Sequence, residues 1–295
     1  MKAICLQARD SNLVLEEIPT PKVGPNQALV AVYACGVSPN ELTWSSTEHL
    51  PVVLGHEIAG IVTEVASNVT QVKVGDPVYA LTDFWQAGGM AEYIATAAID
   101  LAPKPKTLDF IQAASVPLSA LTAWQGLFDY GKLQKGQKVL IHGASGGVGC
   151  FAVQLAKWKG AHVAATASTA NIEFVKSLGA DLMIDYKKEQ FEEKIGPQDL
   201  VLDLVGGDTL ERSLALVTTK AQLVTIVKPH DKATFFIVKP NASQLREIGQ
   251  LIDEGLLHPI VETTFSLQEA QLAFEKGHRR GKSVIEIQRP QACPI

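Results

Sequence analysis

Cysteine is scarce in this sequence, and its spacing follows no binding or cross-linking pattern. The four cysteines are Cys5, Cys35, Cys150 and Cys293, and none forms a C-x-x-C pair. Neither a disulfide framework nor a zinc knuckle is therefore indicated. We expect reduced thiols. Cys150 begins a predicted helix, where it is either a reactive thiol or, as we favour, a small buried apolar side chain.

The sequence has no surplus of positive charge and no long apolar run. Its 26 Lys and Arg residues face 31 Asp and Glu, and the net charge of −5 argues against a nucleic-acid partner. No run is long enough to cross a bilayer, and Met1-Lys2-Ala3 leads straight into a strand pattern rather than a signal peptide. We therefore expect a cytoplasmic protein without a membrane partner. With 295 residues, it is long enough for about two domains.

A strand, a glycine loop, a helix and a second strand follow one another from Lys138 to Thr166. Glycine stands at Gly143, Gly146 and Gly149, and glycine allows the backbone to approach a pyrophosphate closely. The unpaired N–H groups of the following helix bind negative charge. This order predicts a dinucleotide site. The expected contacts at the loop are Ser145, Gly146, Gly147 and Val148.

The alternation of strands and helices continues to about Gly255 and predicts an α/β fold with a doubly wound parallel sheet of six strands. The first two strands flank the glycine loop, and the others are expected at 182–184, 200–202, 223–227 and 235–238. Helices are expected at 170–178 and 243–254. Ser266-x-x-Glu269 predicts a capping box, and a last strand is expected at 283–287. Residues 1 to about 120 instead read as short strands between Gly and Pro turns, typical of a β-rich domain.

Besides the glycine loop, several motifs are spread along the whole chain: Gly55-His56-Glu57-x-Ala59-Gly60, Gly75-Asp76-x-Val78, Pro117-Leu118-x-Ala120-Leu121-Thr122-Ala123-Trp124, Lys176-Ser177-Leu178-Gly179-Ala180-Asp181, Asp203-Leu204-Val205-Gly206-Gly207 and Arg280-Gly281-Lys282. Together they resemble the medium-chain dehydrogenase/reductase family, and most closely its zinc-independent quinone oxidoreductase and enone reductase branch. The resemblance implies a GroES-like catalytic domain at 1–121, completed by 257–295, and a Rossmann NADP-binding domain at 122–256. It also implies a homodimer and a nicotinamide cofactor, with Thr122 and Val205 among the contacts.

The sequence lacks the thiolates that zinc-dependent members of this family use. Ser38 and Leu118 occupy the two cysteine positions, and only His56 of the three ligands is kept. Leucine offers no lone pair and a neutral serine is a poor ligand, so no metal is expected. His56 and Glu57 are then either hydrogen-bonded relics or groups that orient a carbonyl or relay a proton. The candidate catalytic residues are Ser38, Asn40, Glu41, Thr43 and His56, with Trp44 and Trp85 as apolar walls of the cleft.

An acidic residue is also missing where an NAD site needs one, about 20 residues beyond the glycine loop. That place reads Thr166-Ala167-Ser168-Thr169-Ala170, so nothing repels a 2′-phosphate and Ser168 can donate to it. Tyr186 resembles the tyrosine that lies against this phosphate in the quinone reductase branch. The basic residue that often accompanies it is absent from Ala170 and Asn171. We therefore predict NADP(H) as the cofactor, with a modest preference over NAD(H).

These features predict an NADPH-dependent, zinc-independent reductase of quinones or α,β-unsaturated carbonyls, because such a reaction needs a hydride donor and a hydrogen-bond donor but no metal. A non-catalytic NADPH-binding sensor or regulatory module is the alternative, made plausible by the lost zinc ligands and a short rim loop at 44–49. A zinc-type alcohol dehydrogenase is a distant third.

Overall fold

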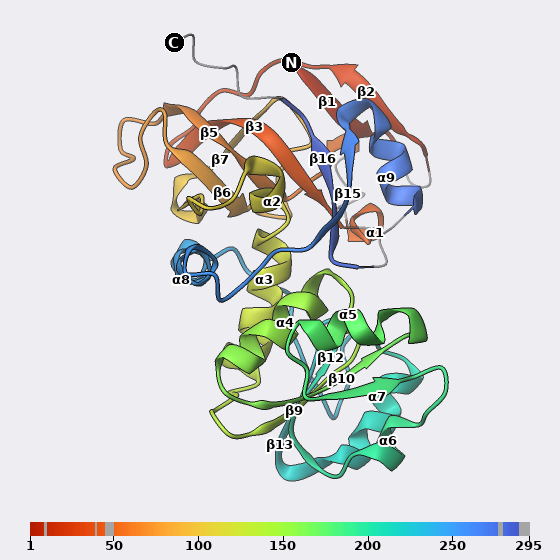
Figure 1. The fold of residues 1–295 in the computed structure, drawn as a ribbon. Coiled ribbons are helices and arrows are strands. Elements are labelled where there is room, and N and C mark those ends of the chain that lie inside the picture. Colours follow the sequence, from red (N-terminus) through yellow and green to blue (C-terminus); the bar gives the residue numbers. More distant parts are fainter. Residues whose placement is uncertain (9–10, 39, 45–49, 277–279, 289–295) are drawn as a thin grey trace.

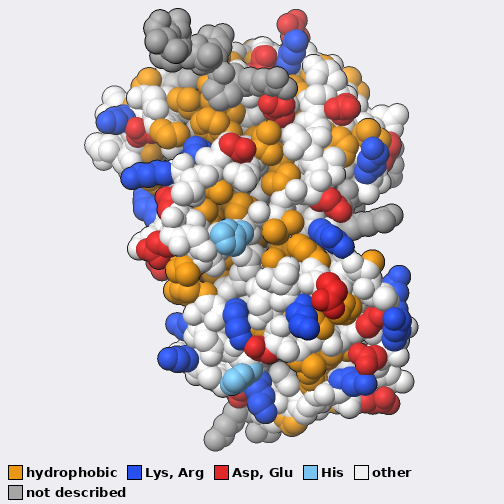
Figure 2. Space-filling model, in the orientation of Figure 1, with side chains coloured by type: hydrophobic (Ala, Val, Ile, Leu, Met, Phe, Trp, Pro, Cys, Tyr) orange, Lys and Arg blue, Asp and Glu red, His pale blue; other side chains and the backbone are white. Residues whose placement is uncertain are grey.

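The structure is a computed structural model that describes residues 1–8, 11–38, 40–44, 50–276 and 280–288. Two bodies are joined through helix α3, Pro117–Trp124, which begins at a proline. A β-rich body lies above and a parallel sheet with helices lies below (Figure 1). On the face shown in Figure 2, acidic and basic side chains are interspersed. No helix within the described ranges is long and apolar enough to cross a membrane.

The lower body contains the predicted parallel sheet, with strand order β11-β10-β9-β12-β13-β14. The order reverses beside β9, so the chain leaves neighbouring strands toward opposite faces and a ligand crevice is expected at that edge. Helices α4, Gly147–Trp158, α5, Ile172–Ser177, α6, Phe191–Lys194, and α7, Asp208–Ser213, connect the strands. The strands are β9, Lys138–Ile141; β10, His162–Ala167; β11, Leu182–Asp185; β12, Gln198–Asp203; β13, Val217–Thr225; and β14, Thr234–Phe235.

Two predicted strand ranges were wrong at their ends. β13 stops at Thr225, whose hydroxyl donates to Asp203 and accepts from the N–H of Val227, so the chain turns there. β14 pairs with β13 through Thr234 and Phe235. The strand expected at 235–238 is therefore only Thr234–Phe235. The helix expected at 170–178 is also divided, into a 3₁₀ turn at Thr169–Asn171 and α5.

The β-rich body has a sheet of order β15-β16-β3-β5-β6-β8, in which β7 also pairs with β3, and a small sheet of order β2-β1-β4. Helices α1, Glu41–Trp44, α2, Phe110–Ala114, and α9, Ala270–Lys276, belong to this body. The strands are β1, Lys2–Leu6; β2, Leu13–Glu17; β3, Gln27–Val37; β4, Val52–Val53; β5, Glu57–Val65; β6, Pro77–Leu81; β7, Tyr93–Ala97; β8, Ala102–Pro103; β15, Val261–Ser266; and β16, Lys282–Glu286.

The C-terminal strands return to the first part of the chain. β16 pairs antiparallel with β3, with Ser283 opposite Val37, and β15 lies on the other side of β16 in the upper body (Figure 1). This register places Lys282 next to Ser38. The predicted capping box is present, because the Glu269 carboxylate accepts hydrogen bonds from the N–H and hydroxyl of Ser266. The domain boundaries at 121 and 256 stay predictions.

Helix α8, Ala242–Asp253, lies beside α3 and contacts β8 of the β-rich body. Its apolar face is the predicted one, with Leu245, Ile248, Leu251 and Ile252 buried. The Tyr79 hydroxyl from β6 donates to the Leu245 carbonyl, and Asp253 accepts from Thr107. These bonds fix the β-rich body against the helix.

Candidate active site

The glycine loop after β9 is built for close approach of the backbone. Gly143 has φ +69°, a conformation that glycine adopts without strain. A Cβ on Gly149 would lie 2.3 Å from the Gly143 carbonyl oxygen, so α4 can pack against the loop only with glycine there. A Cβ on Gly146 would meet only that oxygen, at 3.5 Å, and would otherwise fill open space. This open side, at the N-terminus of a helix of 12 residues, fits a pyrophosphate.

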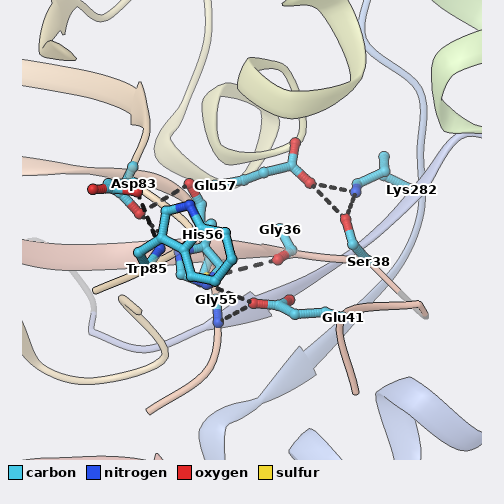
Figure 3. A network of polar contacts seen from close by, with 11 residues as sticks. Gly36, Ser38, Glu41, Gly55, His56, Glu57, Asp83, Trp85 and Lys282 are labelled. Carbon is cyan, nitrogen blue, oxygen red and sulfur yellow. Dashed lines mark hydrogen bonds and ion pairs between the residues drawn. The ribbon is translucent and has the colours of Figure 1, made fainter. Parts of the chain in front are cut away.

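A buried polar cluster adjoins this loop through Lys282. The Lys282 ammonium forms an ion pair with Glu57 and donates to Ser38 Oγ at 2.9 Å (Figure 3). Ser38 donates in turn to Glu57 Oε1 at 3.3 Å, and the N–H of Leu118 donates to Glu57 Oε2 at 3.0 Å. A Cβ on Gly147 would lie 2.7 Å from Lys282 Cδ. A dinucleotide at the loop would therefore lie next to this cluster.

Neighbouring strands bring the members of the cluster together. Ser38 follows β3, Glu57 begins β5 and Lys282 begins β16, and β3 lies between the other two strands. Gly36 makes room for the carboxylate, because a Cβ there would lie 2.9 Å from Glu57 Oε1. The ion pair is nearly excluded from water, with side-chain exposures of 4% for Lys282 and 1% for Glu57. A buried pair of this kind is tolerated because each charge has further hydrogen-bond partners.

Glu41 and His56 form a second polar group beside the cluster (Figure 3). Glu41 Oε1 accepts from the N–H of Gly55 at 2.6 Å and lies 3.6 Å from His56 Nε2, while His56 Nδ1 lies 3.2 Å from Thr82 Oγ1. Burial raises the pKa of Glu41 to about 7 and lowers the pKa of His56 to about 4. At neutral pH His56 is therefore neutral, and Glu41 exchanges its proton within the working range of an enzyme.

The structure brings together three of the five predicted catalytic residues, Ser38, Glu41 and His56. Asn40, just before α1, and Thr43, within α1, are both exposed. The Thr43 hydroxyl donates to the Asn40 carbonyl at 2.6 Å. Within the described ranges, no hydrogen bond joins either side chain to the cluster. Trp85 does not pack in the core, because 78% of it is exposed. The Trp44 side chain and residues 45–49 of the expected rim loop lie outside the described part of the chain.

The predicted cofactor contacts fall into three groups: partly exposed, exposed and buried. Ser145 and Val148 at the loop and Ser168 after β10 are partly exposed, whereas Tyr186 and Val205 are 57% and 51% exposed. Thr122 is buried in α3 and its hydroxyl donates to the Leu118 carbonyl at 2.6 Å. The exposed residues follow the carboxyl ends of β9, β10, β11 and β12, which is the ligand-binding edge of such a sheet.

The donor set at the former zinc position does not fit a metal ion. Leu118 has no ligating side chain, and the Ser38 hydroxyl is engaged by Lys282 and Glu57. No group of three or more His, Cys, Asp and Glu in the described ranges could hold a metal.

Burial raises the pKa of the Cys150 thiol to about 12, which supports the buried apolar side chain over the reactive thiol. Cys5 and Cys35 are also free and buried, and Cys293 lies outside the described residues.

The sequence did not predict a functional role for Lys282 or Arg280, two residues of this region. Both belong to the motif Arg280-Gly281-Lys282, which served only to mark the family. Lys282 reaches Ser38 across 244 positions, and Arg280 reaches Ala170 across 110. A local pattern cannot reveal such contacts, because they depend on how β16 pairs with β3.

Comparison with known proteins agrees with the geometry. The family profile described as alcohol dehydrogenase GroES-like domain matches residues 24–106, and the one described as zinc-binding dehydrogenase matches residues 178–285. The chain is 32% identical to the mouse NAD(P)H oxidoreductase RTN4IP1, mitochondrial, over 89% of this chain and 82% of that protein. It is 34% identical to the Arabidopsis thaliana NADPH-dependent alkenal/one oxidoreductase, chloroplastic, over 94% of this chain and 75% of that protein.

The quinone oxidoreductase from Coxiella burnetii has the same fold. Its structure superposes with a TM-score of 0.91 at 34% identity, covering 98% of this chain and 99% of that one. The chain therefore belongs to the medium-chain dehydrogenase/reductase superfamily, in its branch of quinone oxidoreductases and enone reductases. It is an oxidoreductase with a GroES-like domain and a parallel Rossmann sheet.

Proposed function

We propose that this oxidoreductase uses NADPH to reduce quinones or α,β-unsaturated carbonyl compounds by hydride transfer, without zinc. The observation that carries the proposal is the buried cluster of Ser38, Glu57 and Lys282 beside an open glycine loop, with Leu118 in place of a metal ligand. The relative named for NADPH-dependent reduction of alkenals and alkenones and the quinone oxidoreductase of the same fold support the cofactor and the substrate class.

The residues present can bind the cofactor and polarise a carbonyl. The N–H groups at the start of α4 and the open side of Gly146 would hold the pyrophosphate. When bound, NADPH supplies the hydride that adds to the β-carbon of the substrate. Ser38 Oγ, which accepts a hydrogen bond from the Lys282 ammonium, is the candidate donor to the carbonyl oxygen. Its hydroxyl must turn from Glu57 to the substrate as negative charge develops on that oxygen.

A proton at the α-carbon completes the reduction of the C=C bond. It comes from solvent or from Glu41, because a pKa of about 7 keeps that carboxyl partly protonated at neutral pH. His56, with a pKa of about 4, is neutral there and acts as a hydrogen-bonding neighbour of Glu41 rather than as a cation.

Deuterium transfer tests the regiochemistry. With NADPH deuterated at the transferred position and a 2-alkenone, we expect the label on the β-carbon of the product, and far slower turnover of saturated ketones and primary alcohols. Label on the carbonyl carbon would overturn the proposal by identifying a carbonyl reductase. Tight NADPH binding without oxidation by any enone or quinone would instead favour the non-catalytic sensor.

We further propose a homodimer and a cytoplasmic location, as the family resemblance and the composition predict. Static light scattering should give the mass of two chains. A mass of one chain at micromolar concentration would contradict the homodimer.

A further inference from the structure

The region that would face the adenosine ribose lacks a cation of its own. In a Rossmann fold the residues after the second strand meet the 2′ position of that ribose. Here β10 ends at Ala167 and the following residues, Ser168 to Asn171, are uncharged. Hydroxyl groups alone would balance a 2′-phosphate poorly, because it carries close to two negative charges.

A guanidinium from the far end of the sequence lies against this segment. Arg280 Nε donates to Asn171 Oδ1 at 2.9 Å, and Arg280 Nη2 donates to the Ala170 carbonyl at 2.9 Å. The Arg280 Cζ atom lies 5.0 Å from the centroid of the Phe174 ring on α5, a cation–π distance. Arg280 is exposed. The cation missing from positions 170 and 171 is thus supplied from the segment before β16.

Several bonds hold Arg280 in place relative to the glycine loop. The N–H of Gly281 donates to the Ser145 carbonyl at 2.9 Å, and the N–H of Arg280 itself donates to Glu262 Oε2 at 3.2 Å. Asn171 Nδ2 donates to Ser145 Oγ at 3.2 Å and lies 3.4 Å from Ser168 Oγ. The guanidinium, the asparagine and both serines therefore form one continuous polar network along the ligand-binding edge.

The Asp185 carboxylate, at the end of β11, is compensated by neighbouring donors. It accepts from the Thr169 hydroxyl at 2.6 Å and from the N–H of Lys187 at 3.1 Å, and the Lys188 ammonium lies 3.6 Å away. Thr169 and Lys188 lower its pKa, so it is ionised yet compensated. Its repulsion of an incoming phosphate is correspondingly reduced.

We propose that Arg280 is the residue that binds the 2′-phosphate and makes the site prefer NADP(H) over NAD(H). The inference rests on the proposed function, because it assumes a nicotinamide dinucleotide at the glycine loop. Two of the five guanidinium N–H groups are used in the bonds to Ala170 and Asn171, and a planar fork can offer the others to phosphate oxygens. Ser168, whose Oγ lies 3.4 Å from Asn171 Nδ2, and the exposed Tyr186 are the further expected contacts of the phosphate.

Direct titration of cofactor fluorescence tests Arg280 without any turnover. For Arg280→Gln we expect NADPH affinity to fall at least about tenfold while NADH affinity stays within about twofold, because only NADPH carries the 2′-phosphate. Arg280→Lys should lie between, since it keeps the charge and loses the fork. Arg246→Gln, an exposed arginine on α8, is the matched control and should change neither affinity. Competition with adenosine 2′,5′-bisphosphate should weaken in Arg280→Gln, while competition with adenosine 5′-monophosphate should not.

Each other outcome is decisive. An equal loss of NADPH and NADH affinity in both Arg280 variants would assign Arg280 to the scaffold of the loop and overturn the inference, as would unchanged NADPH affinity. If Arg280→Gln fails to fold, Arg280→Lys decides the question: a ratio of NADPH to NADH affinity below that of wild type supports the inference, and the wild-type ratio overturns it. A wild-type protein that binds NADH as tightly as NADPH would contradict the cofactor of the proposed function itself.

Discussion

The ion pair between Lys282 and Glu57 is buried, and it holds the hydroxyl of Ser38 between the two charges. For Lys282→Met we expect a loss of about 3–5 kcal/mol in the free energy of unfolding, because the carboxylate stays buried without its partner. Urea denaturation at pH 7 measures the change. Lys157→Met, which breaks the surface pair with Asp181 of 44% and 41% exposure, is the control and should cost about 1 kcal/mol or less.

The double variant Lys282→Met with Glu57→Gln separates the effect of an unpaired buried carboxylate from the effect of losing the packing of the lysine stem. We expect it to be more stable than Lys282→Met alone, because no uncompensated carboxylate is then left inside. A double variant that is less stable than the single one would show that packing of the lysine stem, rather than the charge pair, dominates.

Glu41 gives the stability a pH dependence of known sign. Its pKa is about 7 in the folded chain against 4.5 as the ordinary value, so between these pH values the folded state holds a proton that the unfolded state has lost. The contribution of Glu41 to stability is present below pH 4.5 and is lost as pH rises through 7. As pH rises from 4.5 to 8, the free energy of unfolding of Glu41→Gln should therefore increase by on the order of 3 kcal/mol relative to that of wild type.

Thermal or urea unfolding of both proteins across this pH range checks the prediction. His56, whose pKa is lowered to about 4, has the opposite effect: it destabilises the fold as pH falls below 6.5, whereas Glu41 destabilises it as pH rises. Both proteins carry His56, so its titration largely cancels from the difference. A difference that is constant with pH would show that Glu41 has an ordinary pKa.

At the scale of the element, the turn from β9 into α4 distinguishes two kinds of glycine. Gly149→Ala should lower stability markedly, because its Cβ would lie 2.3 Å from the Gly143 carbonyl oxygen. Gly146→Ala should leave stability within about 1 kcal/mol, because Gly146 has φ −74° and ψ 175°, which alanine also adopts, and its Cβ meets open space.

Cofactor titration gives the complementary result. Gly146→Ala should weaken NADPH and NADH alike by tenfold or more, because the methyl group fills the space that a pyrophosphate would take. If Gly146→Ala binds both with wild-type affinity, the open side of the loop is not where the pyrophosphate lies.

At the scale of the molecule, the proposed chemistry should be independent of metal. Elemental analysis of the purified protein should give no stoichiometric zinc, and activity should survive a chelator, because Leu118 and the engaged Ser38 leave too few donors for a catalytic ion. One zinc per chain, lost together with activity, would contradict both the prediction and the zinc-independent part of the proposed function.

The sequence by itself determined the elements and the fold class. Apolar periodicity of 3.6 placed α4 and α8, alternation of strand and helix predicted the parallel sheet, and the glycine spacing located the loop at 143–149. The missing acid at Ser168 and the missing thiolates at Ser38 and Leu118 are local facts that need no coordinates. These signals are readable because each arises from residues within a few turns of one another.

Only the tertiary structure decided which side chains meet. The pairing of β16 with β3 brings Lys282 to Ser38 and Glu57 and carries Arg280 to the end of β10. Burial, which shifts the pKa of Glu41 up and that of His56 down, likewise depends on how separate strands pack. Asn40 and Thr43, which were predicted to line the cleft, lie exposed. Charge and solvation act through space, so contacts across more than a hundred residues have no signature in a local pattern.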